Sequence, residues 1–356
     1  MKRTTLIFML AAMSTGSIQA QWQQQTSPTT NTLNDIYFAD AQRGIAVGAK
    51  GTIIKTSNGG TNWQLVNAFT SDDLVSVYMA DSLNVFVSSA SAGSNSSTVY
   101  KSINGGKSWT KSESDFLPFY ITGTPNRKLF SVSRNIYESS DLGNNWTNRA
   151  VINSTSNCTH ISFADNNTGM AAGNISGILS YSAIFMRSAD GGRTWYANYP
   201  FSFPNFNGFT AMNSLSPDSV FMFTNYYKNF QEGDSSQLIL MTNFKLAAHG
   251  GPDEWEFKST IVVKSFHDKI RDCKFFASKI AYAAGDKGII YASKDGGKNW
   301  KADYKGNISV KSLFMFNEGR GFAVGDKGLI LKRSVAEPVA QTQNTRQIFP
   351  ITEATE

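Results

Sequence analysis

The sequence predicts an all-β protein, a seven-bladed β-propeller of four-stranded antiparallel blades that is closed by an N-terminal strand. Three observations support this fold. The 356-residue chain has 13% aromatic residues and 29 glycines but only 17% charged residues, a composition typical of short strands joined by tight turns. A turn motif that ends in tryptophan recurs along the chain, and no long stretch has a helical period. The seven tryptophans can be assigned one to each repeat unit.

The repeated motif is Ser/Thr-x-Asp/Asn-x-Gly-x-x-Trp. The Asp or Asn side chain can accept backbone N–H groups of a tight turn, and Gly supplies the positive φ that the turn needs. The Trp starts the next strand and packs back onto the hairpin. Turn formation explains these residues, so we assign them a structural role. The clear copies carry Asn58 and Trp63, Asn104 and Trp109, Asp141 and Trp146, Asp190 and Trp195, and Asp295 and Trp300. A sixth, degenerate copy is predicted at Met241-Thr-Asn-Phe, with an insertion before Trp255.

Each motif belongs to a longer unit of three short strands and a fourth that begins near the tryptophan. Four strands per unit, with 37 to 60 residues between tryptophans, is the size of a propeller blade. The last unit, Ser312 to Ser334, lacks the turn motif, whereas Gln21–Gln25 holds a spare tryptophan, Trp22. We expect that segment to supply the fourth strand of the last blade and close the ring. The irregular unit at 200–258 leaves six or eight blades as alternatives.

Both ends of the chain are predicted to lie outside the propeller. Residues 1–20 have the basic Lys2 and Arg3, a short apolar stretch and a cleavage site after Ala20, which is typical of a signal peptide. No apolar run is long enough to cross a bilayer. We therefore divide the chain into a signal peptide at 1–20, a propeller at 21–334 and a disordered tail at 335–356. The mature chain is expected to be exported to a periplasm, a lumen or the outside medium, with no integral membrane segment.

The net charge limits the class of partner, and the cysteine positions indicate whether a disulfide forms. Loss of the signal peptide lowers the formal net charge from +6 to +4, because it removes Lys2 and Arg3 and no acid. The mature chain is thus mildly basic without a long basic run, and we expect no nucleic-acid partner. Cys158 and Cys273 fall in non-adjacent repeat units, so we expect two separate buried thiols and not a disulfide.

The turn motif is the Asp-box, or BNR repeat, which occurs in sialidases, some other glycoside hydrolases and sortilin-type receptors. The longer unit from Asp35 to Trp63, repeated with decay to Ser334, resembles photosystem II assembly and stability factor propellers. The resemblance covers nearly the whole mature chain and implies an exported seven-bladed assembly scaffold without known catalysis. The family often has a Trp after the mid-unit Gly, where this chain has Ile45, Met170 and Phe322. Related propellers occur in non-photosynthetic bacteria, so the resemblance does not imply photosynthesis.

The sequence offers no recognisable catalytic set. Sialidase chemistry needs three arginines, a Tyr–Glu pair and an Asp acid, and the usual Arg-Ile-Pro is replaced here by Arg43-Gly-Ile. His160, His249 and His267 fit no metal-ligand spacing, and the Asp-box turns lack the alternating oxygen ligands of a calcium loop. We therefore expect no catalytic residue, no metal and no cofactor.

Three lysines are candidates for partner binding. Tight turns between the second and third strands of three neighbouring blades carry Lys50, Lys287 and Lys327. On this alignment they gather on one side of a single propeller face. Solvation of a tight turn is the alternative explanation for each lysine.

A second set of candidates is aromatic. The connection at 199–207 carries Phe201, Phe203 and Phe206 and is expected to be partly exposed. Three other segments, at 88–98, 174–183 and 225–237, are predicted to be long loops between second and third strands.

Two functions stay open at this point. The first is a non-enzymatic interaction scaffold that binds a protein partner, such as an envelope or membrane complex, through one loop face. The alternative is a glycan-binding or glycoside-hydrolysing, sialidase-like propeller, which the Asp-boxes and the aromatic connection favour. The sequence identifies neither the partner nor the oligomeric state.

Overall fold

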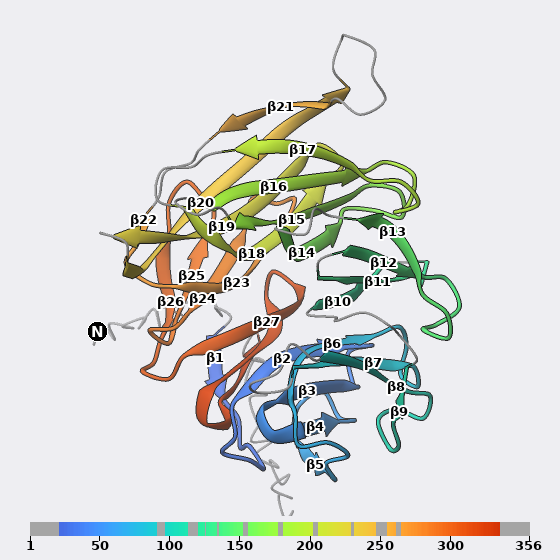
Figure 1. Ribbon diagram of the computed structural model, residues 1–356. Helices are drawn as coiled ribbons and strands as arrows, with labels where there is room; N and C mark the ends of the chain where they lie inside the picture. The colour runs from blue at the N-terminus through green and yellow to red at the C-terminus, as the bar shows by residue number, and fades with distance from the viewer. Residues whose placement is uncertain are drawn as a thin grey trace, which may run out of the picture.

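The computed structural model describes residues 21–90, 97–112, 120–124, 126–133, 135–151, 156–176, 181–201, 206–228, 231–246, 255–260 and 265–334. Within these ranges the chain forms seven antiparallel sheets that follow one another in chain order around a ring (Figure 1). The predicted signal peptide and C-terminal tail lie outside the described residues. No helix in the described ranges has the length and apolar character needed to cross a membrane.

Blades 1 to 4 contain four strands each. Blade 1 is β2 (Leu33–Phe38), β3 (Gly44–Gly48), β4 (Thr52–Thr56) and β5 (Gln64–Val66), with the 3₁₀ turn η1 (Ala49–Gly51) between β3 and β4. Blade 2 is β6 (Asp73–Met79), β7 (Val85–Ala90), β8 (Ser97–Ser102) and β9 (Thr110–Lys111). Blade 3 is β10 (Tyr120–Gly123), β11 (Leu129–Val132), β12 (Asn135–Ser139) and β13 (Thr147–Val151). Blade 4 is β14 (Ser156–Phe163), β15 (Gly169–Ser176), β16 (Tyr181–Ser188) and β17 (Tyr196–Phe201).

Blades 5 to 7 depart from this plan in small ways. Blade 5 is β18 (Phe206–Ser216), β19 (Ser219–Lys228), β20 (Gln231–Leu246) and β21 (Trp255–Thr260), and β22 (Ser265–Phe266) also pairs with β20. Blade 6 is β23 (Ile270–Phe275), β24 (Ala281–Gly285), β25 (Ile289–Ser293) and β26 (Lys301–Lys305). Blade 7 is β27 (Val310–Asn317), β28 (Arg320–Gly325), η2 (Asp326–Gly328), β29 (Ile330–Ser334) and β1 (Gln21–Gln24).

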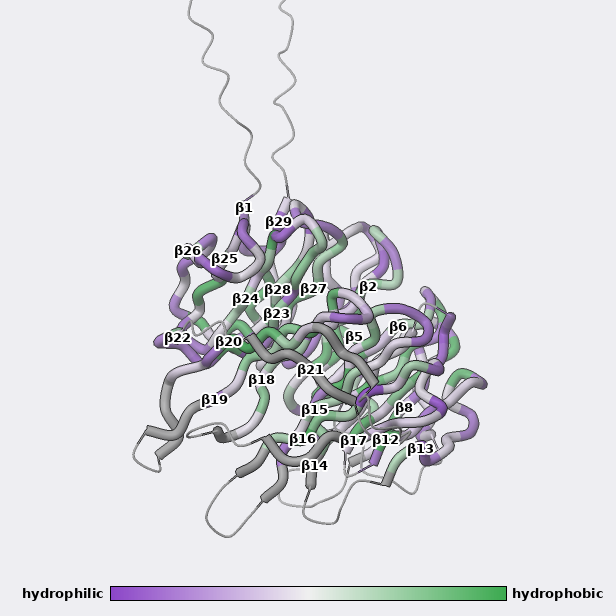
Figure 2. Tube along the Cα trace, turned by 90° about the horizontal axis from the view of Figure 1, so that it is seen from above, coloured by the Kyte–Doolittle hydropathy of each residue, from purple (hydrophilic) through white to green (hydrophobic). Residues whose placement is uncertain are grey.

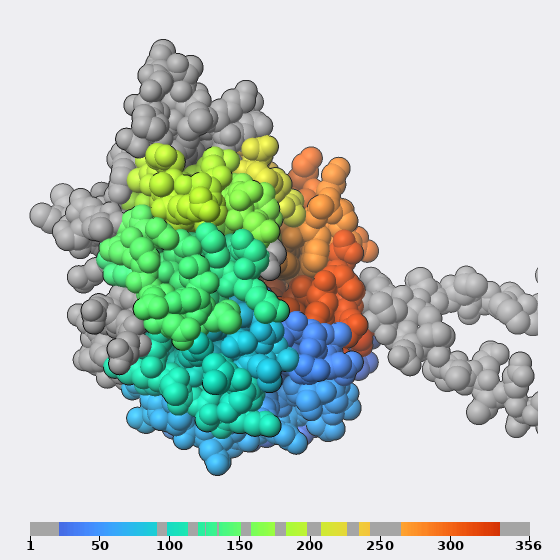
Figure 3. Space-filling model, turned by 90° about the vertical axis from the view of Figure 1, so that its right-hand side faces the viewer, coloured from blue at the N-terminus to red at the C-terminus, as the bar shows by residue number. Residues whose placement is uncertain are grey.

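The two ends of the propeller meet in blade 7, as the spare tryptophan predicted. Strand β1 pairs antiparallel with β29, with Trp22 opposite Arg333, and the two strands lie side by side in Figure 2. The Trp22 indole N–H donates to the Asp303 carboxylate of blade 6 at 2.9 Å, and its ring meets the Tyr282 ring edge-on at 6.4 Å. Figure 3 shows the result from the side: the blue first blade lies directly against the red last blade. Closure leaves no open seam.

Seven hydrophobic clusters hold the described part of the ring together, one at each contact between neighbouring blades. Each is filled by apolar residues of the facing sheets, and Figure 2 shows hydrophobic strands between hydrophilic turns. Ile45, Met170 and Phe322, which replace the family's tryptophan, are all buried in these clusters. Phe322 of blade 7 stacks on Phe38 of blade 1 with ring centroids 4.5 Å apart.

The Asp-box turns share one hydrogen-bond pattern. In the first copy the Thr56 hydroxyl accepts the N–H of Gly60 at 2.9 Å and donates to the Asn58 side-chain oxygen at 3.0 Å. That oxygen also accepts the N–H of Asn62 at 3.0 Å. The copy at Asp295 has the same bonds, with Asn299 as the donor at 2.9 Å. The motif thus closes the link between the third and fourth strands of a blade.

Blade 5 corrects two expectations. The degenerate turn predicted at 241–244 is wrong, because β20 runs through it and stays paired with β21 across a bulge between Thr242 and Lys245. These residues include no glycine to supply a positive φ. The segment 225–237 is also less of a loop than predicted, because β19 and β20 stay paired out to Lys228 and Gln231. Blade 4 likewise extends its hairpin to Ser176 and Tyr181.

Candidate functional site

The first strand of each blade lines the central channel, and the loops form two faces. The turns between second and third strands lie beside the blade-to-blade connections, as shown by the N–H of Gly51 donating to Asp72 at 2.8 Å. We call this side the lysine face, because it carries Lys50, Lys287 and Lys327. The Asp-box turns lie at the other ends of the same strands, and we call that side the Asp-box face.

The three predicted lysines lie in equivalent turns of blades 1, 6 and 7, which are consecutive around the ring. All three side chains are exposed. Lys50 and Lys327 have positive φ, 57° and 55°, so each also meets the backbone demand of a tight turn. The N–H of Lys50 donates to Asp73 at 2.9 Å and that of Lys287 to Asp268 at 3.0 Å. The turns therefore point three cations outward from one side of the lysine face.

A cavity of about 690 Å³ opens where the channel reaches the lysine face, and we call it the channel mouth. Its lining includes Lys269, Arg271 and Lys311 from blades 6 and 7, and one acid, Asp73. His160, on inner strand β14, also lines it. Loss of hydration lowers the pKa of His160 to about 4, so this ring is neutral at physiological pH. The positive charge of the mouth comes from its lysines and arginine.

Bulges in the inner strands aim side chains into this mouth. Six of the seven described inner strands skip one residue in their pairing with the second strand, at equivalent places. A β-bulge inserts an extra residue and turns its side chain away from the ladder. The bulged residues that line the mouth are Asn34, Val75, Thr210, Arg271 and Lys311. The fold thus places one bulged side chain from each of five blades at the mouth.

Arg271 and Lys311 share an acidic partner. The Arg271 guanidinium makes two hydrogen bonds to the Asp286 carboxylate, at 2.8 and 2.6 Å, and the Lys311 amine lies 3.4 Å from it. Burial alone would raise the pKa of Asp286, but the bonds from Arg271 and Ser309 hold it at about 2. Asp286 therefore stays ionised and orients both cations. Lys269, Arg271 and Lys311 thus bring three basic side chains to this side of the mouth, and Lys311 also lies 3.4 Å from the Asp326 carboxylate.

The channel wall below the mouth holds two partly buried carboxyls, Asp35 and Asp272. Burial raises the pKa of Asp35 to about 6 and that of Asp272 to about 7. Asp35 accepts the N–H of Val77 in blade 2 at 2.8 Å, and Asp272 accepts the N–H of Leu313 in blade 7 at 2.7 Å. Because each carboxyl binds the next blade, we assign both a structural role.

The other predictions have separate outcomes. Phe203 lies outside the described residues, and only the backbone of Phe201 and Phe206 is described, at the end of β17 and the start of β18. The aromatic connection therefore stays a prediction. Cys158 and Cys273 are free, buried thiols of blades 4 and 6, as expected, and burial raises the pKa of Cys158 to about 12. Among the described residues, no three His, Cys, Asp or Glu side chains gather into a metal-binding group.

Sequence reasoning missed Lys269, Arg271 and Lys311. A signal was present for two of them. In the inner strands the core residues lie three positions apart, as in Ile270 to Cys273 and Val310 to Leu313, where a regular strand would place them two apart. The extra position between them marks the bulge and its outward residue.

Comparison with known proteins shows a family by sequence and a propeller fold that other protein classes share. The chain is 22% identical over 325 residues to "Photosystem II stability/assembly factor HCF136, chloroplastic" of Arabidopsis thaliana, covering 84% of this chain and 75% of that protein. The fold is similar to YCF48 from Cyanidioschyzon merolae, with a TM-score of 0.63 and 22% identity over 88% of this chain and 99% of that one. It is also similar to a structure of YCF48 bound to D1 peptide, with a TM-score of 0.61 and 20% identity over 88% and 96% of the two chains. The family profile described as "Photosynthesis system II assembly factor YCF48" matches residues 15–125 and 232–334, and the chain therefore belongs to this family of BNR-type propellers.

Proposed function

We propose that this protein is an exported, non-enzymatic assembly scaffold whose channel mouth binds an acidic segment of a protein partner. The observation that carries the proposal is the row of inner-strand bulges, which aims Arg271 and Lys311 into a cavity large enough for a peptide. The exposed Lys50, Lys287 and Lys327 extend the same charge over the lysine face. Such a field favours capture of an acidic chain.

The comparisons support the kind of partner. A related propeller, YCF48, has been solved with a D1 peptide, so a protein with this fold binds a peptide. For this chain we propose a segment of an envelope or membrane complex, reached after export by the signal peptide at 1–20. The Asp-box carboxylates are committed to their turns, and the described lining of the mouth holds one arginine. These two facts support binding over sialidase-like hydrolysis.

The test compares variants that each change three basic side chains in one part of the surface, and the control changes the net charge at least as much as either test variant. One removes the mouth cations (Lys269→Gln, Arg271→Gln and Lys311→Gln), and a second reverses the turn lysines (Lys50→Glu, Lys287→Glu and Lys327→Glu). The matched control reverses three exposed lysines of the Asp-box face (Lys294→Glu, Lys298→Glu and Lys301→Glu). Partner capture from envelope extracts should fall with the first two variants and persist with the control.

Two results would overturn the proposal. Capture that is equally strong with the mouth variant and the wild type would place the binding surface elsewhere. Cleavage of a fluorogenic glycoside, abolished by one carboxylate substitution, would show an enzyme and replace the scaffold with the glycan-active alternative. A glycan array on the same protein separates binding of sugars from binding of peptides.

A further inference from the structure

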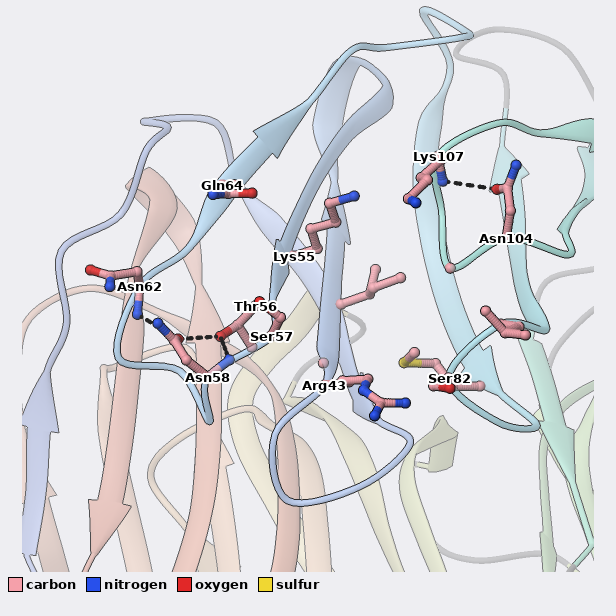
Figure 4. Close-up of a pocket in the computed structure, with 15 residues that line it drawn as sticks. Arg43, Lys55, Thr56, Ser57, Asn58, Asn62, Gln64, Ser82, Asn104 and Lys107 are labelled. Atoms are coloured by element: carbon pink, nitrogen blue, oxygen red, sulfur yellow. Dashed lines mark hydrogen bonds between the residues drawn. The ribbon is translucent and has the colours of Figure 1, made fainter.

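A second cleft lies at the opposite end of the molecule from the channel mouth. It has a volume of about 520 Å³ and opens between blades 1 and 2 on the Asp-box face (Figure 4). Ile45 and Met79 belong to its lining and are buried in the core between these two blades. Lys50 of the lysine face lies at the opposite ends of β3 and β4 from this cleft. The cleft and the mouth have no lining residue in common.

The lining of this cleft carries only positive charge. Arg43, Lys55 and Lys107 line it, and no Asp or Glu does. Arg43 pairs with Asp40 at 3.7 Å, but both side chains are exposed and such a pair is weak. In the described part of the chain no carboxylate lies within ion-pair distance of Lys55 or Lys107. Lys55 and Lys107 thus have no ion-pair partner among the described residues, and Arg43 has a weak, exposed one.

The Asp-boxes themselves are altered at this cleft. The two boxes that border it carry Asn58 and Asn104, whereas the other clear boxes carry Asp141, Asp190 and Asp295. The turn needs only the side-chain oxygen: Asn58 accepts the N–H four residues on at 3.0 Å, and Asp141 does so at 2.9 Å. Hydrogen bonds to that turn hold the pKa of Asp295 at about 2, so a box carboxyl is ionised at neutral pH. Asparagine therefore keeps the turn and removes two negative charges from the cleft wall.

One exposed aliphatic side chain lies among the cations. Leu83 lines the cleft and is 56% exposed, which makes it one of the few large hydrophobic side chains exposed in the described residues. The lining has no aromatic ring on which a sugar could stack. An exposed aliphatic side chain in a basic cleft suits a peptide better than a sugar.

We propose that this cleft binds an acidic peptide segment with apolar side chains, supplied by a protein partner, separately from the channel mouth. Carboxylates of the segment meet Arg43, Lys55 and Lys107, and an apolar side chain contacts Leu83. A scaffold with one site on each face holds two segments at once. The inference does not depend on the proposed function of the mouth.

The test uses two labelled peptides, a dodecamer of alternating Glu and Leu and a dodecamer of Glu alone. Peptide binding is measured by fluorescence anisotropy in the mouth variant described above. Because that variant lacks the mouth cations, the signal reports binding at the cleft. The key change is Asn58→Asp with Asn104→Asp, which gives these boxes the carboxyls of the other boxes and keeps the turn bonds that the side-chain oxygen accepts. The affinity for the Glu-Leu peptide should fall about tenfold or more, with thermal unfolding unchanged. The all-Glu peptide should bind more weakly than the Glu-Leu peptide.

The matched control is Asp141→Asn with Asp295→Asn. It removes two carboxyls from boxes that do not line the cleft, whereas the key change adds two carboxyls at the cleft. It should leave the peptide affinity within about twofold. Lys55→Gln with Lys107→Gln should weaken binding as the aspartates do. A folded Asn58→Asp, Asn104→Asp protein that binds the peptide as tightly as its parent overturns the proposal. Tighter binding of a labelled sulfated glycan than of the Glu-Leu peptide also overturns it, in favour of an acidic polysaccharide.

Discussion

The carboxyls of Asp35 and Asp272, from blades 1 and 6, both contact the single hydroxyl of Ser312 in blade 7, at 2.8 and 3.2 Å. A hydroxyl has one proton and can donate it to only one of them. When Ser312 donates to Asp35, the contact with Asp272 is favourable only if Asp272 is protonated. The raised pKa of Asp272, about 7, agrees with this arrangement. The joint that closes the ring therefore holds a proton near neutral pH.

This joint makes stability depend on pH. The pKa of Asp272 is raised in the folded state, so its contribution is full below about pH 4 and is lost as pH rises through about 7. Asp272→Asn removes that loss. The difference in unfolding free energy between variant and wild type should move in favour of the variant from pH 5 to pH 8, by on the order of 1–3 kcal/mol. Urea unfolding at four pH values measures it.

Comparing variant with wild type at each pH cancels the other titrating groups. His160 has a lowered pKa, so its contribution is present above about 6.5 and is lost as pH falls through about 4, opposite in direction to that of Asp272. His160→Gln gives a control that should change the acid side of the profile only. A difference between Asp272→Asn and wild type that is constant with pH would show that the Asp272 carboxyl is ionised throughout.

Trp22 should be the most costly residue to remove from the N-terminal strand. Its side chain is 7% exposed, packs on Tyr282 and Arg333, and bonds Asp303. Trp22→Ala is expected to lower the unfolding free energy by about 3–5 kcal/mol, because it leaves a cavity and removes one of the two hydrogen bonds to the Asp303 carboxylate, the other coming from Arg333. Trp22→Phe retains most of the packing and should cost less. Thermal unfolding of both variants checks this, and equal loss for the two would contradict the packing argument.

Gly60 is expected to tolerate no side chain, for a reason beyond its backbone. Its φ is 75°, and a Cβ there would lie 2.3 Å from the ring of Phe322 in blade 7. Gly296 is a matched control, because its φ is 73° but the nearest side-chain atom to its Cβ would be 3.9 Å away. Gly296→Ala should cost about 1–2 kcal/mol from the backbone alone, and Gly60→Ala should cost about 1–3 kcal/mol more from overpacking. An equal loss of unfolding free energy in the two variants would mean that Phe322 moves away from the added methyl group at little cost.

Most of the fold could be predicted because one local unit repeats and each unit carries its own turn chemistry. The Asp-box needs only a hydroxyl, an Asp or Asn oxygen and a glycine pair, and all are visible in the sequence. Even the pairing of the two chain ends could be predicted, because Trp22 was the one tryptophan that did not end a repeat unit of its own. Blade 5 was harder because its third strand lacks these residues, and strand pairing of 231–246 with its neighbours then depends on tertiary contacts.

Only part of the candidate site could be predicted from the sequence, and the reason is geometric. Lys50, Lys287 and Lys327 stand in turns that the repeat marks clearly. Arg271 and Lys311 stand in strands, where alternation predicts that a side chain points into a neighbouring blade. The bulge that turns them to the mouth is a property of pairing between two strands, and it becomes evident only once the register is known.

Asp286 gives the last prediction, since it restrains the two cations that the bulges place at the mouth. It is ionised above about pH 2, and it occupies Arg271 and Lys311 in the absence of a partner. Asp286→Asn keeps an acceptor for Ser309 and removes the negative charge. An acidic peptide then no longer competes with the Asp286 carboxylate for Arg271 and Lys311. Its affinity for the mouth should rise about three- to tenfold at low salt, and the gain should shrink at 0.5 M salt. Asp141→Asn, on blade 3 and the other face, is the control and should change nothing. Weaker binding with Asp286→Asn would mean that Asp286 positions the cations for the ligand more than it competes with it.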